Sequence, residues 1–220
     1  MVVKALRKRP RKSQESHLWK QFGYQESIHV IPHHMAPATG VGPRDPKKVV
    51  MVSRFDHVKG QIPVLSAFKE VLKIVPDAQL ELYGRGADER KIRDEIDRLG
   101  LGDSVNIPGF TADASQVFSE AAVSIVASTY EGFCLSMGES MAAGCVPVSY
   151  GFKYGPQDLI RPGIDAMLVE PGNVKDLADS ISFLLLNEEH RERMSQASTT
   201  IVDRISEARL IDEWRKILGY

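Results

Sequence analysis

The stretch VSIVASTYEGFCLSMGESMAAGCVPVSY, from Val123 to Tyr150, contains the pattern that decides the fold. It begins with a run of small and β-branched residues at 123–128 that predicts a buried strand, and it ends with a second such run at 146–150. Between them, Leu135 to Ala143 has helical spacing and is followed by Gly144, a residue type common at helix ends. The order of buried strand, helix and buried strand predicts a unit with parallel strands.

The same alternation continues on both sides of this unit. We predict further strands at 48–54, 79–83, 104–107 and 166–169, and helices at 61–75, 87–99 and 113–121. Short strands that alternate with helices form parallel sheets with helices on both faces. The sequence therefore predicts an α/β, Rossmann-like, doubly wound domain with a parallel sheet of about six strands.

The segments that flank this domain have a different character. Upstream, we expect a helix at 13–22, a strand at 27–32 and a connector rich in proline and glycine at 36–46. Downstream, helices are expected at 173–186, 188–205 and 207–218, and the last has an apolar face that must pack on another surface. We therefore divide the chain into a lead-in and linker (1–46), a nucleotide-binding Rossmann-like domain (47–187) and C-terminal helices (188–220).

Composition and charge exclude several classes of protein. With 220 residues, 43% hydrophobic and 26% charged, the chain is unlike disordered, collagen-like or disulfide-stapled proteins. The net charge of -1 offers no global field for nucleic acid, although six of the first twelve residues are basic and none is acidic. This basic leader offers a peripheral contact with an anionic membrane or polymer. The absence of a signal peptide or a long apolar run, together with only two cysteines, predicts a cytoplasmic protein with reduced thiols.

An anion site is expected where the strand at 123–128 ends. Ligands bind outside the carboxyl ends of the strands in open α/β sheets, and here Glu131 and Gly132 come directly before a helix. The backbone amides of Phe133, Cys134, Leu135 and Ser136 would point out of the helix start and favour an anion. Such turns are common, however, and many of them bind no ligand.

Two carboxylates and two cations accompany this turn. Glu131 and Glu139 could accept hydrogen bonds from sugar or ribose hydroxyls, although Glu131 could equally cap the helix while Glu139 is solvated. Arg54 and Lys59 follow the strand at 48–54 and suit a leaving diphosphate, or are ordinary surface cations.

A glycine pair follows the strand at 79–83. Gly84 and Gly86 form a tight turn, but the third glycine of a dinucleotide fingerprint is replaced by Glu89, which argues against NAD.

Together, Arg54, Lys59, the glycine turn and the spacing of seven residues between Glu131 and Glu139 resemble the donor-binding half of a retaining GT-B glycosyltransferase of the glycogen-synthase-like family four. The resemblance covers roughly residues 47–187. It implies that Arg54 and Lys59 bind the donor diphosphate, that Glu131 contacts the transferred sugar and that Glu139 contacts the ribose. It also implies that Ile107 and Pro108, within the segment 106–109, meet the base.

The stretch YGFKYGPQDLI at 150–160 is similar to a narrower branch, the poly(glycerol-phosphate) α-glucosyltransferases and relatives that glycosylate serine-rich proteins. Its Gly155 and Pro156 are also explained by an ordinary helix start. One departure is Cys134, which stands where the family usually has glycine, so we expect its bulk to crowd the phosphate.

Metal chemistry is not expected. The chain has no Asp-x-Asp motif, and His33 and His34 have no third ligand at useful spacing, so a metal site is not predicted. We therefore expect a UDP-sugar as substrate, no cofactor and no metal.

The resemblance implies a hexosyltransferase domain that moves glucose or N-acetylglucosamine from a UDP-sugar to a hydroxyl acceptor, such as a glycerol-phosphate teichoic acid polymer or a glycoprotein. It also implies a partner domain, N-terminal to this one, that carries the acceptor site. Because only about 46 residues precede the predicted domain, we expect this chain to be inactive alone. The alternatives are a non-catalytic module that binds sugar nucleotides or anionic polymers, and another GT-B enzyme such as an epimerase or phosphorylase.

Overall fold

The computed structural model describes residues 33–39, 42–152 and 159–220. The basic leader, the helix expected at 13–22, the strand expected at 27–32 and the Tyr154-Gly155-Pro156 motif lie outside the described residues.

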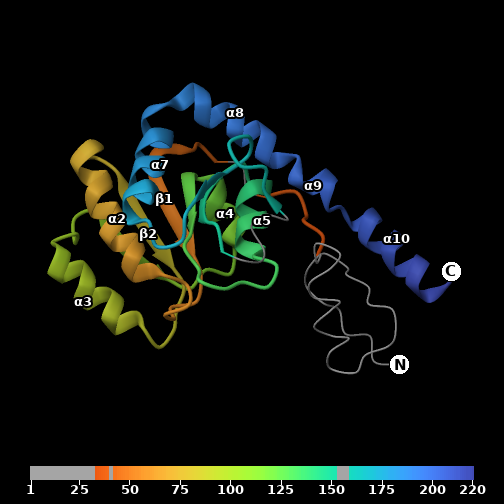
Figure 1. Ribbon diagram of the computed structural model, residues 1–220, viewed down its shortest axis with the longest axis horizontal. Coiled ribbons are helices and arrows are strands. Elements are labelled where there is room, and N and C mark those ends of the chain that lie inside the picture. Colours follow the sequence, from red (N-terminus) through yellow and green to blue (C-terminus); the bar gives the residue numbers. More distant parts are fainter. Residues whose placement is uncertain (1–32, 40–41, 153–158) are drawn as a thin grey trace.

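Six parallel strands form one sheet at the centre of the domain, as predicted (Figure 1). The order across the sheet is β3-β2-β1-β4-β5-β6, so the order reverses between β1 and β4. The strands are β1 (Asp45–Val52), β2 (Gln79–Tyr83), β3 (Val105–Gly109), β4 (Ala121–Val126), β5 (Val146–Tyr150) and β6 (Met167–Val169).

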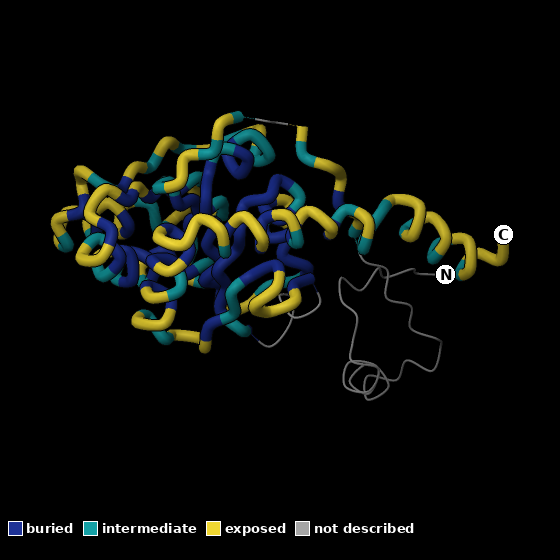
Figure 2. The backbone as a smooth tube through the Cα atoms, turned by 90° about the horizontal axis from the view of Figure 1, so that it is seen from above, coloured by how far each residue is buried: buried dark blue, intermediate teal, exposed yellow. Residues whose placement is uncertain are grey.

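Two neighbouring strands of the sheet, β4 and β5, are buried along their whole length. Every residue of β4 and β5 is buried, and the two strands pair in register from Val123 opposite Val146 to Val126 opposite Ser149. Figure 2 shows this buried backbone at the centre, surrounded by more exposed helices. Helices cover both faces of a parallel sheet, which explains why these strands read as continuous apolar runs instead of an alternation.

The helices lie in two groups on the sheet (Figure 1). On one side α2 contacts both α3 and α7, and on the other α5 contacts α4, α8 and α9. Their bounds are α2 (Gln61–Ile74), α3 (Glu89–Leu99), α4 (Ala114–Ser119), α5 (Leu135–Ala142), α7 (Val174–Leu186), α8 (Glu188–Thr199), α9 (Ile201–Arg204) and α10 (Glu207–Leu218). None of the described helices is long and apolar enough to cross a membrane.

Several element ends differ from the prediction. The strands β1 and β4 end at Val52 and Val126, two residues earlier than expected, which leaves longer loops at the edge of the sheet. The helix expected at 113–121 is shorter because the Asp113 carboxylate caps it, accepting from Gln116 N at 3.0 Å, and because Ala121 already belongs to β4.

The single helix expected at 188–205 is divided into α8 and α9 at Thr200. Here Thr199 Oγ1 donates to the carbonyl of Gln196 at 2.9 Å, and Thr200 Oγ1 donates to that of Ala197 at 2.7 Å. Hydroxyls that bond to a nearby backbone compete with the helical ladder, and this accounts for the break. Arg161 also donates to Ala197 O and to Thr200 Oγ1.

The last helix, α10, has the predicted bounds but extends away from the sheet (Figures 1 and 2). It has no buried residue, and Ile211 and Leu218 are 41% and 48% exposed. The surface on which its apolar face was expected to pack is therefore not found within the described part of the chain.

Candidate functional site

The candidate site lies where the strand order reverses. The loop 53–60 after β1 and the loop 127–134 after β4 follow adjacent parallel strands, so both leave the same edge of the sheet. The amide of Thr129 donates to the carbonyl of Val58 at 2.8 Å and joins the two loops. Gly60, with φ 77°, comes directly before α2 and packs against the joined loops. Glycine is required there because a Cβ would lie 2.3 Å from the carbonyl oxygen of Ala127.

The structure brings Lys59 and Glu131 into direct contact. Lys59 Nζ lies 2.5 Å from Glu131 Oε1, and the two side chains are only 16% and 14% exposed. The hydroxyl of Ser128, itself 3% exposed, donates to the same oxygen at 2.7 Å. A predicted cation and a predicted carboxylate thus form one ion pair that bridges the two loops, while Ser128 was not expected from the sequence.

Arg54 is placed differently from Lys59. Its side chain is 79% exposed, and its Nη2 lies 3.3 Å from Asp56 Oδ2. The backbone beneath it is held by Gln61, which is 2% exposed and donates from Nε2 to Arg54 O at 2.7 Å and to Ser53 Oγ at 3.0 Å. Arg54 therefore lies at the outer part of the site on a well-held loop. Gln61 is a second residue that sequence reasoning missed.

The first amides of α5 precede its hydrogen-bond ladder, while their predicted role in anion binding stays a prediction. The carbonyl of Cys134 accepts from the amides of Met137 and Gly138 at 3.1 and 3.3 Å, so the helical ladder begins there. The amides of Leu135 and Ser136 precede this ladder and have no acceptor within the helix. Together with the helix dipole, they favour an anion at this point.

Cys134 adopts a left-handed backbone conformation, with φ 63° and ψ 60°. It is the single residue other than glycine with positive φ among the described residues. The side chain is 4% exposed and belongs to the main apolar core. Burial, with a contribution from nearby Glu131, raises the pKa of the Cys134 thiol to about 12, so the thiol is neutral at pH 7. The thiol packs into the core, and the expected crowding of a phosphate stays a prediction.

Glu139 lies on α5 and is exposed. Partial desolvation raises the pKa of its carboxyl above the ordinary value. Within the described residues it has no ion-pair partner, and no hydrogen bond joins it to Glu131.

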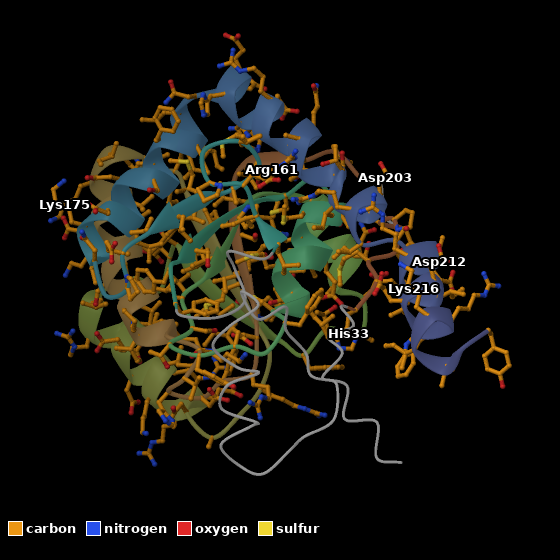
Figure 3. All side chains as sticks on the ribbon, turned by 45° about the vertical axis from the view of Figure 1, so that its right-hand side comes forward. His33, Arg161, Lys175, Asp203, Asp212 and Lys216 are labelled. Carbon is orange, nitrogen blue, oxygen red and sulfur yellow. The ribbon has the colours of Figure 1, made fainter. Side chains whose placement is uncertain are left out.

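The loop residues between Glu131 and α5 contact the segment that enters the domain. Phe133 is 8% exposed, and the ring of His33 meets it edge-on with 5.3 Å between ring centroids. Figure 3 shows His33 on the side of the molecule from which α10 extends. The next residues are anchored too, since Met35 N donates to Ile205 O at 2.9 Å. A histidine beside Phe133 could not be predicted from the sequence, because the contact joins segments about a hundred residues apart.

The glycine pair has a packing role. A Cβ on Gly84 would lie 1.9 Å from Ser53 O, and one on Gly86 would lie 2.2 Å from Phe55 O. The loop between them is joined to the loop after β1 by a hydrogen bond from Phe55 N to Arg85 O at 3.0 Å. Gly84 and Gly86 therefore allow two loops to pack closely beneath Arg54.

The segment expected to meet a base forms β3 and its end. Ile107 is half-buried and Pro108 is exposed. Just beyond, Phe110 is 65% exposed, and the guanidinium carbon of Arg85 lies 5.0 Å from its ring centroid. Neither residue of this cation–π pair was predicted as part of the site. Among the described residues, no three histidine, cysteine or acidic side chains gather as a candidate metal site.

Comparison with known proteins agrees with this geometry. Residues 39–200 match the family model described as glycosyl transferases group 1. Over 196 residues the chain is 31% identical to a Bacillus subtilis (strain 168) protein named poly(glycerol-phosphate) alpha-glucosyltransferase, covering 87% of this chain and 29% of that protein.

Two solved structures are similar to the domain. A crystal structure of Staphylococcus aureus TarM in complex with fondaparinux, alpha-GlcNAc-glycerol and UDP has a TM-score of 0.85 at 22% identity, over 94% of this chain and 43% of that chain. The pneumococcal O-GlcNAc transferase GtfA in complex with UDP and GlcNAc has a TM-score of 0.82 at 25% identity, over 94% and 43%. The fold is thus that of one domain of a GT-B glycosyltransferase.

The chain spans less than half the length of these three proteins. The family model spans residues 39–200, which contain the six strands and both loops of the site. The chain belongs to the group 1 family of glycosyltransferases.

Proposed function

We propose that this chain is the donor-binding domain of a retaining hexosyltransferase that moves glucose or N-acetylglucosamine from a UDP-sugar to a hydroxyl acceptor. The observation that carries the proposal is the Lys59–Glu131 pair beside the start of α5, at the edge where the strand order reverses. The B. subtilis relative is named as a glucosyltransferase, and the GtfA structure holds UDP and GlcNAc.

In this proposal, the charges of the site act on the departing diphosphate. Lys59, Arg54 and the amides at the start of α5 stabilise the negative charge that develops as the bond between the sugar C1 and the phosphate oxygen breaks. Glu131 accepts hydrogen bonds from the transferred sugar, and Glu139 accepts one from the ribose. The acceptor hydroxyl forms the new bond to C1 on the face that the diphosphate leaves, and its proton passes to a diphosphate oxygen.

We also propose that no divalent metal is needed, because Lys59, Arg54 and a helix N-terminus already supply the counter-charge for a diphosphate. Calorimetric titration with UDP in EDTA and in magnesium or manganese tests this point. Equal affinity in both is expected, and an absolute requirement for metal would contradict it.

We also propose an acceptor and a cellular location. A glycerol-phosphate polymer is the first acceptor to test, because it appears in the name of the B. subtilis relative. A cytoplasmic site of action is proposed because UDP-sugars would be the substrate.

The direct test of the donor is a screen by thermal shift and calorimetry. A ligand that binds only the folded state raises the free energy of unfolding by RT ln(1 + [L]/Kd), so the melting temperature rises with ligand concentration. UDP, UDP-glucose and UDP-N-acetylglucosamine should stabilise the chain, whereas ADP-glucose and free glucose at the same concentrations should not. Stabilisation by none of the three uridine ligands would refute the proposed donor.

A further inference from the structure

The Lys59–Glu131 pair places a carboxylate where the proposed donor should place a phosphate. Glu131 Oε1 lies 2.5 Å from Lys59 Nζ, and it also accepts from Ser128 Oγ at 2.7 Å. One carboxylate oxygen of Glu131 is thus bound to the ammonium of Lys59. Both side chains are mostly buried, so little water competes with this ion pair.

Resting on the proposed function, we propose that Glu131 is an internal counter-ion that the donor diphosphate must displace from Lys59, and that Ser128 is the positioning residue that retains Glu131 afterwards. The ion pair opens when a phosphate oxygen takes the place of Glu131 Oε1 at the ammonium. Ser128 keeps its hydrogen bond, so the released carboxylate stays at the loop after β4 and turns to the sugar hydroxyls.

Charge explains why the two anions exchange instead of sharing the lysine. A diphosphate held by Lys59 and by the amides of Leu135 and Ser136 would lie close to Glu131, because these groups surround the same loop end. Two anions at such a distance repel each other strongly when the surroundings exclude water. The carboxylate must therefore move away from the ammonium as the diphosphate arrives.

Removal of an ordinary binding residue weakens the binding of its ligand, whereas removal of the Glu131 charge should tighten the binding of the diphosphate. Glu131 competes with the diphosphate for Lys59, so part of the diphosphate binding energy is used to open the pair. Replacing Glu131 by glutamine removes that competitor while keeping the shape of the side chain. Binding of UDP should then become tighter, whereas the preference for UDP-glucose over UDP should fall.

The experiment measures Kd for UDP and for inorganic pyrophosphate by calorimetry, with the whole chain as wild type, Glu131→Gln and Glu70→Gln. Glu70 lies on α2 and pairs with Lys73 on the surface, so this variant makes the same change in net charge outside the site. We expect Glu131→Gln to bind both probes about three- to tenfold tighter and Glu70→Gln to match wild type. Unchanged or weaker binding by Glu131→Gln, or an equal gain in Glu70→Gln, would overturn the exchange.

Ser128 is tested separately through a ratio that a purely structural role would not change. Ser128→Ala should keep the wild-type melting temperature within a few degrees and the wild-type Kd for UDP within about twofold, but it should lower the preference for UDP-glucose over UDP. Ser128→Thr retains the hydroxyl and should restore that preference. An unchanged ratio in Ser128→Ala would exclude the positioning role.

These outcomes also separate the inference from the proposed function. If wild type binds neither UDP nor UDP-glucose, the proposed donor site itself is wrong. If wild type binds UDP and Glu131→Gln binds it no better, the site stands and the exchange is refuted.

Discussion

At the scale of single residues, the two predicted cations differ in what surrounds them. Lys59 is 16% exposed and pairs with a carboxylate that is 14% exposed, whereas Arg54 is 79% exposed and pairs with Asp56 at 3.3 Å. Hydrogen bonds that involve charged groups contribute roughly 1.5–3 kcal/mol, but exposed ion pairs contribute about 0–1 kcal/mol. A contact between the cation and a diphosphate should therefore be stronger at Lys59 than at Arg54.

We accordingly expect Lys59→Ala to weaken UDP binding by roughly 1.5–3 kcal/mol and Arg54→Ala by about 1 kcal/mol or less. Calorimetric titration of both variants with UDP measures the difference, and Lys59→Arg serves as the charge-retaining control. Equal losses at the two positions would show that the exposure of Arg54 changes when UDP binds.

Cys134 combines a buried side chain with a backbone conformation that costs L-residues about 1–2 kcal/mol. Cys134→Gly and Cys134→Ala both remove the thiol, and they differ mainly in that backbone cost. We expect the glycine variant to be the more stable by about 1 kcal/mol in urea unfolding.

Cys145 provides the matched control for this comparison. It is fully buried but does not have positive φ, so its alanine variant should be at least as stable as its glycine variant. The same order of stability at both positions would contradict the assignment of strain to Cys134.

At the scale of elements, the loops after β1 and β2 must pack closely to hold the site. A Cβ at position 86 would lie 2.2 Å from Phe55 O. This oxygen belongs to the backbone, which cannot move aside as easily as the end of a flexible side chain. We expect Gly86→Ala to lower the free energy of unfolding by about 1–3 kcal/mol and to weaken UDP binding as well. Urea unfolding and calorimetry measure the two effects.

Gly102 is the control for this prediction, because a Cβ there would meet nothing within 4 Å and its φ is not positive. Gly102→Ala should leave both stability and UDP binding close to wild type. A Gly86→Ala variant that behaves like Gly102→Ala would show that the two loops do not need their close approach.

The sequence was informative about elements where packing follows a short local pattern. The strands β2 and β5 and the helix α10 have the predicted bounds, since apolar runs and caps are encoded within a few residues. Helix breaks were not predicted, because the end of α8 depends on hydroxyl groups at Thr199 and Thr200 and on Arg161, which lies far away in the sequence. Local periodicity contains no information about such a contact.

At the scale of the whole molecule, the site is assembled from residues that are distant in the chain. Lys59 and Glu131 are 72 residues apart, and their pairing follows from the parallel sheet, which brings the ends of β1 and β4 to one edge. Their residue types and spacing were predictable from motifs, and their direct contact was not. Ser128 and Gln61 were missed because their hydrogen bonds depend on the conformation of the loops beside them, which has no sequence signature. His33 was missed because its contact with Phe133 joins segments a hundred residues apart.

The described part of the chain forms one sheet domain, and the chain spans 43% of the TarM and GtfA chains to which it is similar. Transfer of a sugar needs an acceptor hydroxyl held in line with C1, and such positioning can account for roughly 7–11 kcal/mol of a reaction barrier. The groups of the site are proposed to bind the donor, and none is proposed to bind an acceptor. We therefore expect these 220 residues, produced alone, to bind UDP-glucose without transferring glucose at a useful rate.

The measurement incubates the 220-residue chain with UDP-glucose and a glycerol-phosphate polymer and follows glucosylated polymer by mass spectrometry, with donor binding checked in the same preparation. Donor binding without product is the expected result, because no group of this chain is proposed to hold the acceptor hydroxyl in line with C1. Slow release of free glucose, without glucosylated polymer, would fit the same argument, since water can take the place of the acceptor. Repeated turnover of polymer by this chain would show that the chain itself holds the acceptor, and α10, with its exposed apolar face, would then be the first element to mutate.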